Sequence, residues 1–365
     1  TERTVVTEQS VTPRIQKEVP KRQYRSARFL AKLLPMGVTV LFRTHLTEDY
    51  PELLREFSER HPDAQITVLT EDTDLPEMLP AAEVLVAAPV KEETLNRAAK
   101  LKLHIVPFAG VNRAPLHWYR KNGVILASSH GNAATVAERA VALALAAAGR
   151  VVEFDRDLRR GLWHRNQSNS RPFDFWHSLR GAPTAILGAG AIGVETARLL
   201  RPLVGRVVAF RRSSTGTTPE PFNDVTTDLS EAIADARLIV GALPLTKETQ
   251  GLLQRHHFEA ADRPVFVNVS RAAIVEEETL FSCLSERIIG AAGLDVWYRY
   301  PDPFWSEQMP SHLPFEELPN VVLSPHAGSH AEEGKVGQLE GALELLDSYL
   351  SGRVVPGQID LERGY

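Results

Sequence analysis

Cysteine and long hydrophobic runs are both scarce in this sequence. The single cysteine, Cys283, excludes a disulfide within the 365 residues and follows the apolar helical pattern of Leu280 and Leu284, where a small buried thiol is expected. The most apolar stretch, residues 141–149, is far shorter than the ~20 residues that a membrane-spanning helix needs. The sequence therefore predicts neither a disulfide framework nor a membrane-spanning helix.

The sequence also lacks an excess of positive charge. Lys and Arg together number 41 against 46 Asp and Glu, which gives a formal net charge of -5. Without a broad basic field, we expect neither nucleic acid nor a membrane surface as a partner, and a small molecule is the default. Residues 1–25 are polar and contain no apolar core segment, so we expect no signal peptide and a cytoplasmic location.

The length and the order of apolar runs predict two domains. Short β-rich runs alternate with helical patterns twice along the chain, and a long Ala- and Leu-rich helical pattern, residues 135–150, separates the two series. The predicted strands are residues 38–42, 66–69, 84–88, 103–106 and 124–127, then 184–187, 206–210, 238–242, 265–269, 290–294 and 321–323. This pattern predicts an α/β protein with two Rossmann-like or flavodoxin-like doubly wound parallel sheets and a cleft between them.

A glycine-rich loop connects the strand at 184–187 to a predicted helix over residues 194–200. Gly188 permits a tight turn, Gly190 lets the backbone approach a pyrophosphate, and Gly193 lets helix and strand pack closely. The loop, including Ala191 and Ile192, then presents helix N-terminal amides to the anion. An ordinary glycine turn is the alternative, but the coincidence of strand, loop and helix favours dinucleotide binding.

The residues after the next strand indicate which dinucleotide binds. NAD-binding versions of this motif place an acidic residue at the end of that strand, whereas this chain has Arg211, Arg212 and Ser213. Two guanidiniums and a hydroxyl suit a 2′-phosphate, which a carboxylate would repel. We therefore predict NADP, with NAD possible; a solvated basic turn is the alternative interpretation.

Several further motifs occur in an order that resembles the D-isomer-specific 2-hydroxyacid dehydrogenases, including glyoxylate and hydroxypyruvate reductases. The resemblance covers about residues 38–365 and rests on FAGVN at 108–112, ATVAE at 134–138, LRG at 179–181, LPLT at 243–246, VNVSR at 267–271, LDV at 294–296 and SPH at 324–326.

The resemblance implies a domain plan. Residues 36–134 and 328–365 would form a substrate domain, residues 135–327 a dinucleotide-binding domain, and residues 1–35 an N-terminal extension. Within the second domain, residues 150–180 include exposed-looking aromatics such as Trp163 and Trp176 and would form a dimerisation arm of a homodimer. The alternative is an irregular loop folded back on its own domain.

The resemblance also implies roles for single residues. Arg271 would grip the substrate carboxylate and keto oxygen, and His326 would transfer the proton. The backbone amides of Ala109 and Gly110 would cradle the substrate carboxylate, and Asp295 would receive the nicotinamide amide. Leu243 and Pro244 would pack on the adenine side, Val269 and Gly328 would also contact the cofactor, and no metal is expected.

One position departs from the family. Relatives that reduce keto acids pair the histidine with a glutamate, and this chain has Tyr300 there, which brings no negative charge. We predict a hydride transfer between NAD(P)H and a small 2-keto or 2-hydroxy acid, with Glu332 or Glu333 as candidate replacement partners of His326. The alternatives are a dinucleotide-sensing, corepressor-like binding protein and an oxidase of a formate-like acid, although the formate-site asparagine is not clearly recognisable.

Overall fold

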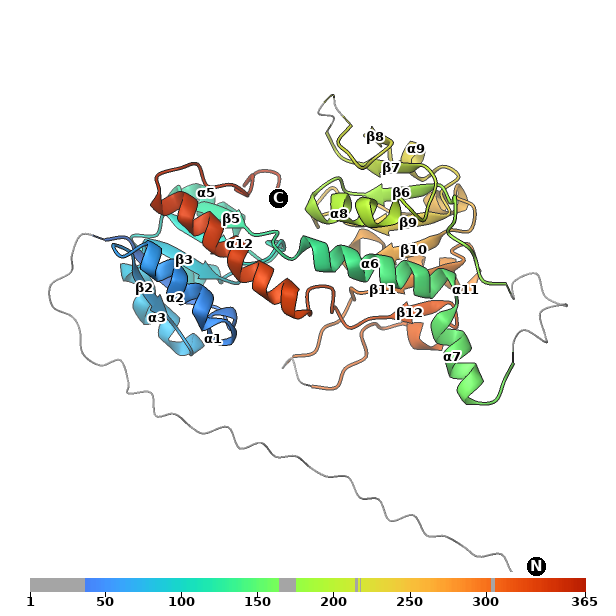
Figure 1. Cartoon of the computed structure of the whole chain (residues 1–365), viewed down its shortest axis with the longest axis horizontal. Helices are drawn as coiled ribbons and strands as arrows, with labels where there is room; N and C mark the ends of the chain where they lie inside the picture. The colour runs from blue at the N-terminus through green and yellow to red at the C-terminus, as the bar shows by residue number, and fades with distance from the viewer. Residues whose placement is uncertain (1–36, 164–174, 214–215, 217, 303–305) are drawn as a thin grey trace, which may run out of the picture. The chain divides into compact units, whose positions relative to one another are not determined.

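Two parallel β-sheets organise the chain in a computed structural model that describes residues 37–163, 175–213, 216, 218–302 and 306–365. The chain divides into residues 1–36, which lie outside this description, and a second unit, residues 37–365 (Figure 1). The strands are β1 (Thr39–Arg43), β2 (Gln65–Val68), β3 (Val84–Ala87), β4 (Leu103–Val106), β5 (Ile125–Ser128), β6 (Thr184–Leu187), β7 (Val207–Phe210), β8 (Asp224–Thr226), β9 (Leu238–Gly241), β10 (Val265–Asn268), β11 (Ala291–Leu294) and β12 (Val321–Leu323).

Helices connect these strands. The α-helices are α1 (Leu46–Asp49), α2 (Pro51–Arg60), α3 (Leu75–Met78), α4 (Glu92–Leu95), α5 (Leu116–Asn122), α6 (Ala133–Ala148), α7 (Val151–Arg159), α8 (Ala191–Leu200), α9 (Leu229–Ile233), α10 (Arg255–Glu259), α11 (Glu277–Ser285) and α12 (Glu332–Leu350). Short 3-10 turns are η1 (Asp72–Asp74), η2 (Leu79–Ala81), η4 (Ala272–Ile274) and η5 (Phe315–Glu317).

In each sheet, successive strands are added first toward one edge and then toward the other, so the strand order has one point of reversal. The first sheet has the order β2-β1-β3-β4-β5, so its reversal lies between β1 and β3, and the second has the order β12-β11-β10-β9-β6-β7-β8, with its reversal between β6 and β9. All pairings within both sheets are parallel. The predicted fold class is confirmed, and open sheets of this kind bind ligands at the carboxyl ends of the strands near the reversal.

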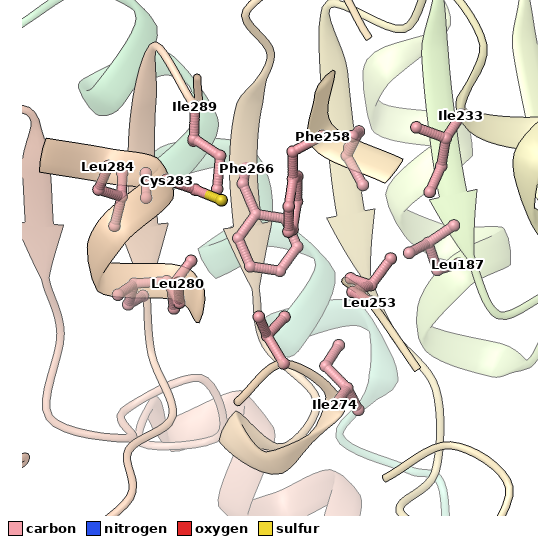
Figure 2. Close-up of a cluster of buried hydrophobic side chains, with 14 of the residues drawn as sticks. Leu187, Ile233, Leu253, Phe258, Phe266, Ile274, Leu280, Cys283, Leu284 and Ile289 are labelled. Carbon is pink, nitrogen blue, oxygen red and sulfur yellow. The ribbon is translucent and has the colours of Figure 1, made fainter. Parts of the chain in front are cut away.

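Apolar side chains cover both faces of each sheet. On the first sheet, Leu339 and Leu346 of α12 pack against Val40 and Val84, while the opposite face buries Leu85 and Leu126. On the second sheet, α6 covers one face, and the other face holds the cluster drawn in Figure 2. Cys283 lies in that cluster and is fully buried, as expected, and burial raises the pKa of its thiol.

Two glycines bring α12 into contact with the segment between β5 and α6. A Cβ added to Gly131 would lie 1.8 Å from the carbonyl oxygen of Gly337, and a Cβ added to Gly337 would lie 2.3 Å from the carbonyl oxygen of Gly131. Only residues without a side chain allow two backbones to approach this closely. This Gly131–Gly337 contact therefore fixes where the long C-terminal helix crosses the connection between the sheets.

The sequence patterns missed α7. The predicted helix over residues 135–150 corresponds to α6, and the unpredicted α7 begins directly after Arg150, which adopts a left-handed φ of 52°. On and beside α7, Val152, Leu158 and Trp176 are exposed. The predicted arm at 150–180 thus begins with a helix that presents apolar side chains, whereas residues 164–174 lie outside the described part of the chain.

Candidate functional site

A cavity of about 1540 Å³ opens between the carboxyl ends of strands from both sheets. Its walls come from the segments that follow β1, β3 and β4 in the first sheet and β10, β11 and β12 in the second. Nine of the residues singled out in the sequence line it, namely Ala109, Gly110, Ile192, Val269, Arg271, Asp295, Tyr300, His326 and Gly328. The structure thus brings the predicted substrate and nicotinamide contacts to one place.

Arg271 follows β10 and is held by its own loop. Its Nη1 donates to the carbonyl oxygen of Ser270 at 2.7 Å, and its Nε donates to Oδ1 of Asn112 at 3.2 Å. Buried Asn268 fixes the loop, since its Nδ2 donates to the carbonyl oxygen of Arg271 at 3.0 Å and its Oδ1 accepts the backbone N–H of Ser270. Desolvation by burial lowers the pKa of Arg271, yet a guanidinium stays charged near neutral pH.

Gly110 packs directly against the Arg271 guanidinium. A Cβ at Gly110 would lie 2.0 Å from Nη2 of Arg271, so the two groups are in direct contact. Among the described residues, the backbone N–H groups of Ala109 and Gly110 donate no hydrogen bond. Two free amides beside a guanidinium form a geometry that suits a carboxylate.

His326 follows β12 and stands next to Tyr300. Their ring centroids are 5.5 Å apart, and the Tyr300 hydroxyl accepts a bond from the backbone N–H of Trp297 at 3.2 Å. The φ of His326 is 56°, in the left-handed region that non-glycine residues occupy only when the surrounding structure holds them there. In the described part of the chain, no carboxylate forms a hydrogen bond or ion pair with the His326 ring.

Desolvation lowers the pKa of His326, although the ring remains partly open to solvent. The negative charge of Asp295 raises this pKa and the positive charge of Arg271 lowers it. The carboxylate that acts on the histidine is therefore Asp295, while neither Glu332 nor Glu333 lines the cavity. Desolvation likewise raises the pKa of Tyr300, so its hydroxyl stays neutral.

Asp295 holds the loop that carries His326. It is almost fully buried, and its Oδ1 accepts bonds from the Ser324 hydroxyl and from the backbone N–H of Ala327 at 2.9 Å. Its Oδ2 accepts the N–H of Gly328 at 3.0 Å. The sequence predicted only a nicotinamide contact for Asp295, and the structure adds this positioning of the loop at residues 324–328.

The glycine-rich loop lies between β6 and α8, beyond the cavity except for Ile192. Gly188 has a φ of 119° and packs against the carbonyl oxygen of Ala242, and a Cβ at Gly193 would lie 1.8 Å from the carbonyl oxygen of Gly188. At Gly190 a Cβ would meet nothing within 4 Å. Open space above Gly190 and tight packing at the other two glycines fit a bound pyrophosphate at Gly190 and Ala191, where α8 begins.

The predicted adenosine-side residues form a separate group. Leu243 is buried whereas Pro244 is exposed, and neither lines the cavity. After β7, Arg211 is partly buried, and Arg212 and Ser213 are exposed. Two partners of Arg212 are distant in sequence and were not foreseen: Nη1 donates to Glu248 Oε2 at 3.2 Å, and Nε donates to the Tyr365 hydroxyl at 3.1 Å.

Sequence reasoning also missed Asn132, which occupies the N-cap position of α6 without a side-chain capping bond and lines the cavity. The residue is 7% exposed, and its Oδ1 has no hydrogen-bond partner among the described residues. A buried amide oxygen without a partner is costly unless a ligand or water satisfies it. The only signal in the sequence was its position four residues before Val136, within the run that leads into the ATVAE motif.

The cavity is positively charged overall. Arg43, Lys91, Arg271, Arg299 and Lys335 line it, against the carboxylates of Asp49, Asp295 and Glu316. This excess favours an anionic ligand. In the described part of the chain, no three His, Cys, Asp or Glu side chains gather as metal ligands, and no helix there is long and apolar enough to cross a membrane.

Known proteins with similar sequences and structures agree with this geometry. The family described as D-isomer specific 2-hydroxyacid dehydrogenase, NAD binding domain, matches residues 141–328. A glyoxylate reductase of Thermococcus litoralis is 28% identical over 283 residues, covering 77% of this chain and 83% of the relative.

Two solved structures extend the comparison. A protein of Thermus thermophilus is 28% identical with a TM-score of 0.65, covering 88% of this chain and 100% of the other. An NAD-dependent formate dehydrogenase from Staphylococcus aureus, in complex with NAD, shares the fold with a TM-score of 0.69 at 21% identity, covering 90% of this chain and 100% of the other. The chain belongs to the D-isomer specific 2-hydroxyacid dehydrogenase family and is an NAD(P)-dependent enzyme of that family.

Proposed function

We propose that this enzyme reduces small 2-keto acids with NADPH. The observation that carries the proposal is the meeting of Arg271, His326 and the free amides of residues 109 and 110 around one positively charged cavity. A guanidinium and amides recognise a carboxylate, and an imidazole can protonate the neighbouring keto oxygen. The related glyoxylate reductase supports a 2-keto acid as the substrate class.

Each residue has a defined task in this reaction. The bound nicotinamide supplies a hydride to the keto carbon. Arg271 holds the carboxylate and polarises the keto oxygen through Nη2, the one guanidinium nitrogen that forms no hydrogen bond with a described residue. His326, in its protonated form, transfers its proton to that oxygen as the carbon accepts the hydride, and solvent then restores the proton. Asp295 and Tyr300 keep the imidazole in position.

The preference for NADPH rests on Arg211 and Arg212, which follow β7 where an NAD-binding site would place an acidic residue. Glu248 forms an ion pair with Arg212, and its negative charge would repel a 2′-phosphate, whereas the positive charge of the guanidinium would attract it. We therefore propose NADPH as the preferred cofactor and NADH as a poorer one.

We also propose that the first sheet and α12 form the substrate domain, and that a second copy of the chain covers α7 in a homodimer.

The test is cofactor consumption with glyoxylate, hydroxypyruvate, pyruvate and phenylpyruvate, each with NADPH and with NADH. We expect turnover of at least one acid and a higher kcat/KM for NADPH. The variants Arg271→Ala and His326→Ala should each lower kcat/KM for the acid by about 10²-fold or more, because each removes a group that acts on the developing alkoxide. Absence of turnover with every acid would refute the reductase, and a preference for NADH would refute the cofactor assignment.

A second reaction is favoured by two observations in the cavity. His326 has no carboxylate hydrogen-bonded to its ring among the described residues, and the buried amide of Asn132 has an unsatisfied oxygen there. Oxidation of a formate-like acid transfers a hydride to the cofactor without a proton relay, and it requires an oriented polar group to hold the small acid. Reduction of NAD or NADP in the presence of formate would support this reaction, and its loss in Asn132→Ala but not in His326→Ala would assign it to the amide.

A further inference from the structure

Arg212 is held by a segment that belongs to the other sheet. Its guanidinium carbon lies 4.4 Å from the centroid of the Tyr365 ring, and its Nε donates to the Tyr365 hydroxyl at 3.1 Å. Arg212 follows β7 of the second sheet, whereas Tyr365 ends a turn packed on the first. The contact therefore joins the proposed cofactor side to the proposed substrate side.

The turn that carries Tyr365 is well anchored. Residue Ile359 donates its N–H to the carbonyl oxygen of Leu126 in β5, and Leu361 packs with the apolar cluster on that sheet. Asp360 Oδ1 accepts the backbone N–H groups of residues 362 and 363 at 3.0 Å each. Glu362 forms an ion pair with Arg120 of α5. Tyr365 thus projects from a fixed turn.

The remaining edge of Arg212 is available for a ligand. Nη1 donates to Glu248 at 3.2 Å and Nε to Tyr365, and no described residue accepts a hydrogen bond from Nη2. The Arg212 side chain is 35% exposed, so an anion can reach it. A guanidinium held on one face by an aromatic ring loses less rotational freedom when it binds a phosphate.

We propose that Tyr365 is a positioning residue for cofactor specificity, which holds Arg212 so that it binds the 2′-phosphate of NADPH. This inference rests on the proposed function, because it assumes that Arg212 contacts that phosphate. Glu248 has the opposite effect, since its carboxylate repels the phosphate while it engages Nη1. The balance between Tyr365 and Glu248 sets how strongly the enzyme distinguishes NADPH from NADH.

The experiment compares the KM values for NADPH and NADH in variants of the 365-residue chain at a saturating concentration of acid. Tyr365→Ala should raise the KM for NADPH by about 3- to 10-fold, the loss expected for one partly exposed cation–π contact and one hydrogen bond. The KM for NADH should change by less than about twofold, because NADH has no 2′-phosphate. The matched variant Tyr365→Phe keeps the ring and should show a smaller effect than Tyr365→Ala. Glu248→Gln should lower the KM for NADPH.

A double substitution separates positioning from a general structural effect. In an Arg212→Ala background, Tyr365→Ala should have no further effect on NADPH, since its partner is gone. If Arg212→Ala weakens NADPH but Tyr365→Ala does not, the inference is wrong and the proposed cofactor contact stands. If Arg212→Ala leaves NADPH unchanged, both are wrong. A Tyr365→Ala variant that binds NADPH more tightly would mean that the ring obstructs the site, and this too would overturn the inference.

Discussion

Replacing Gly110 by alanine should disable the enzyme without unfolding it. The new Cβ would lie 2.0 Å from Arg271 Nη2 and 3.3 Å from its Cζ, and ordinary contact begins near 3.4 Å, so the guanidinium would have to move by about 1.4 Å. That movement would disturb its bonds to Asn112 and Ser270. A displacement of about 1 Å in a positioning group can cost about 10²-fold in rate, which corresponds to about 2.7 kcal/mol.

The assay is steady-state NADPH oxidation with a 2-keto acid, accompanied by a thermal melt. We expect kcat/KM for the acid to fall by about 10²-fold and the KM for NADPH to stay within about twofold. The melting temperature should change by only a few degrees at most, because the nearest atom belongs to the end of a long side chain that can move aside.

Gly190→Ala provides the matched control. Its Cβ would meet no protein atom within 4 Å, so we expect it to spare folding and to raise the KM for NADPH. In the double variant Gly110→Ala and Arg271→Ala, activity should be no lower than with Arg271→Ala alone. A Gly110→Ala enzyme with normal kcat/KM would refute the reasoning, because the arginine would then not act from this position.

Three further predictions concern protons and assembly. Because desolvation lowers the pKa of His326 and the protonated ring drives reduction, kcat/KM for a keto acid should fall as pH rises, with a midpoint below the ordinary 6.5; a rate that is flat through neutral pH would contradict this. Buried His104, bonded to the Tyr119 hydroxyl at 2.7 Å, has its pKa lowered to about 4, so the folded state binds fewer protons and loses stability as pH falls from 6.5. The loss between pH 7 and 5 should be about 2 kcal/mol in denaturant unfolding, and His104→Gln should remove it; parallel pH profiles of the two proteins would exclude this origin. Val152→Glu and Leu158→Glu on exposed α7 should convert a dimer to a monomer in sedimentation experiments, and unchanged dimers would place the interface elsewhere.

The strands were predictable because their side chains are apolar and rich in valine, isoleucine and leucine. Every predicted strand agrees with an observed strand to within one residue at either end. β8 was missed because it is a three-residue edge strand that begins with Asp224 and contains only one valine. α7 was missed because the predicted helical pattern ended at Arg150, and no side-chain type indicates in advance that a left-handed residue here is followed by a second helix.

The sequence motifs identified the residues that line the cavity, but they did not identify the partners of Arg212 on the proposed cofactor side. Arg271, His326 and Asp295 belong to motifs in the sequence, and all three line the cavity. The partners of Arg212 could not be foreseen, because Glu248 and Tyr365 are brought to it only by the packing of distant segments. The loop-holding bonds of Asp295 were equally hidden, since a carboxylate in a motif does not reveal which backbone amides surround it.

The Gly131–Gly337 contact bears on how the enzyme could open and close. Two backbones that touch at one point without intervening side chains can pivot there, whereas sliding would bring bulkier neighbours such as Ser129, whose hydroxyl oxygen already lies 2.2 Å from where a Cβ of Gly341 would be, into collision. We therefore expect any rotation of one sheet against the other to take place about this crossing. A methyl group at either glycine would lie within 2.3 Å of a backbone carbonyl oxygen, so α12 and the segment before α6 would have to move apart at this point.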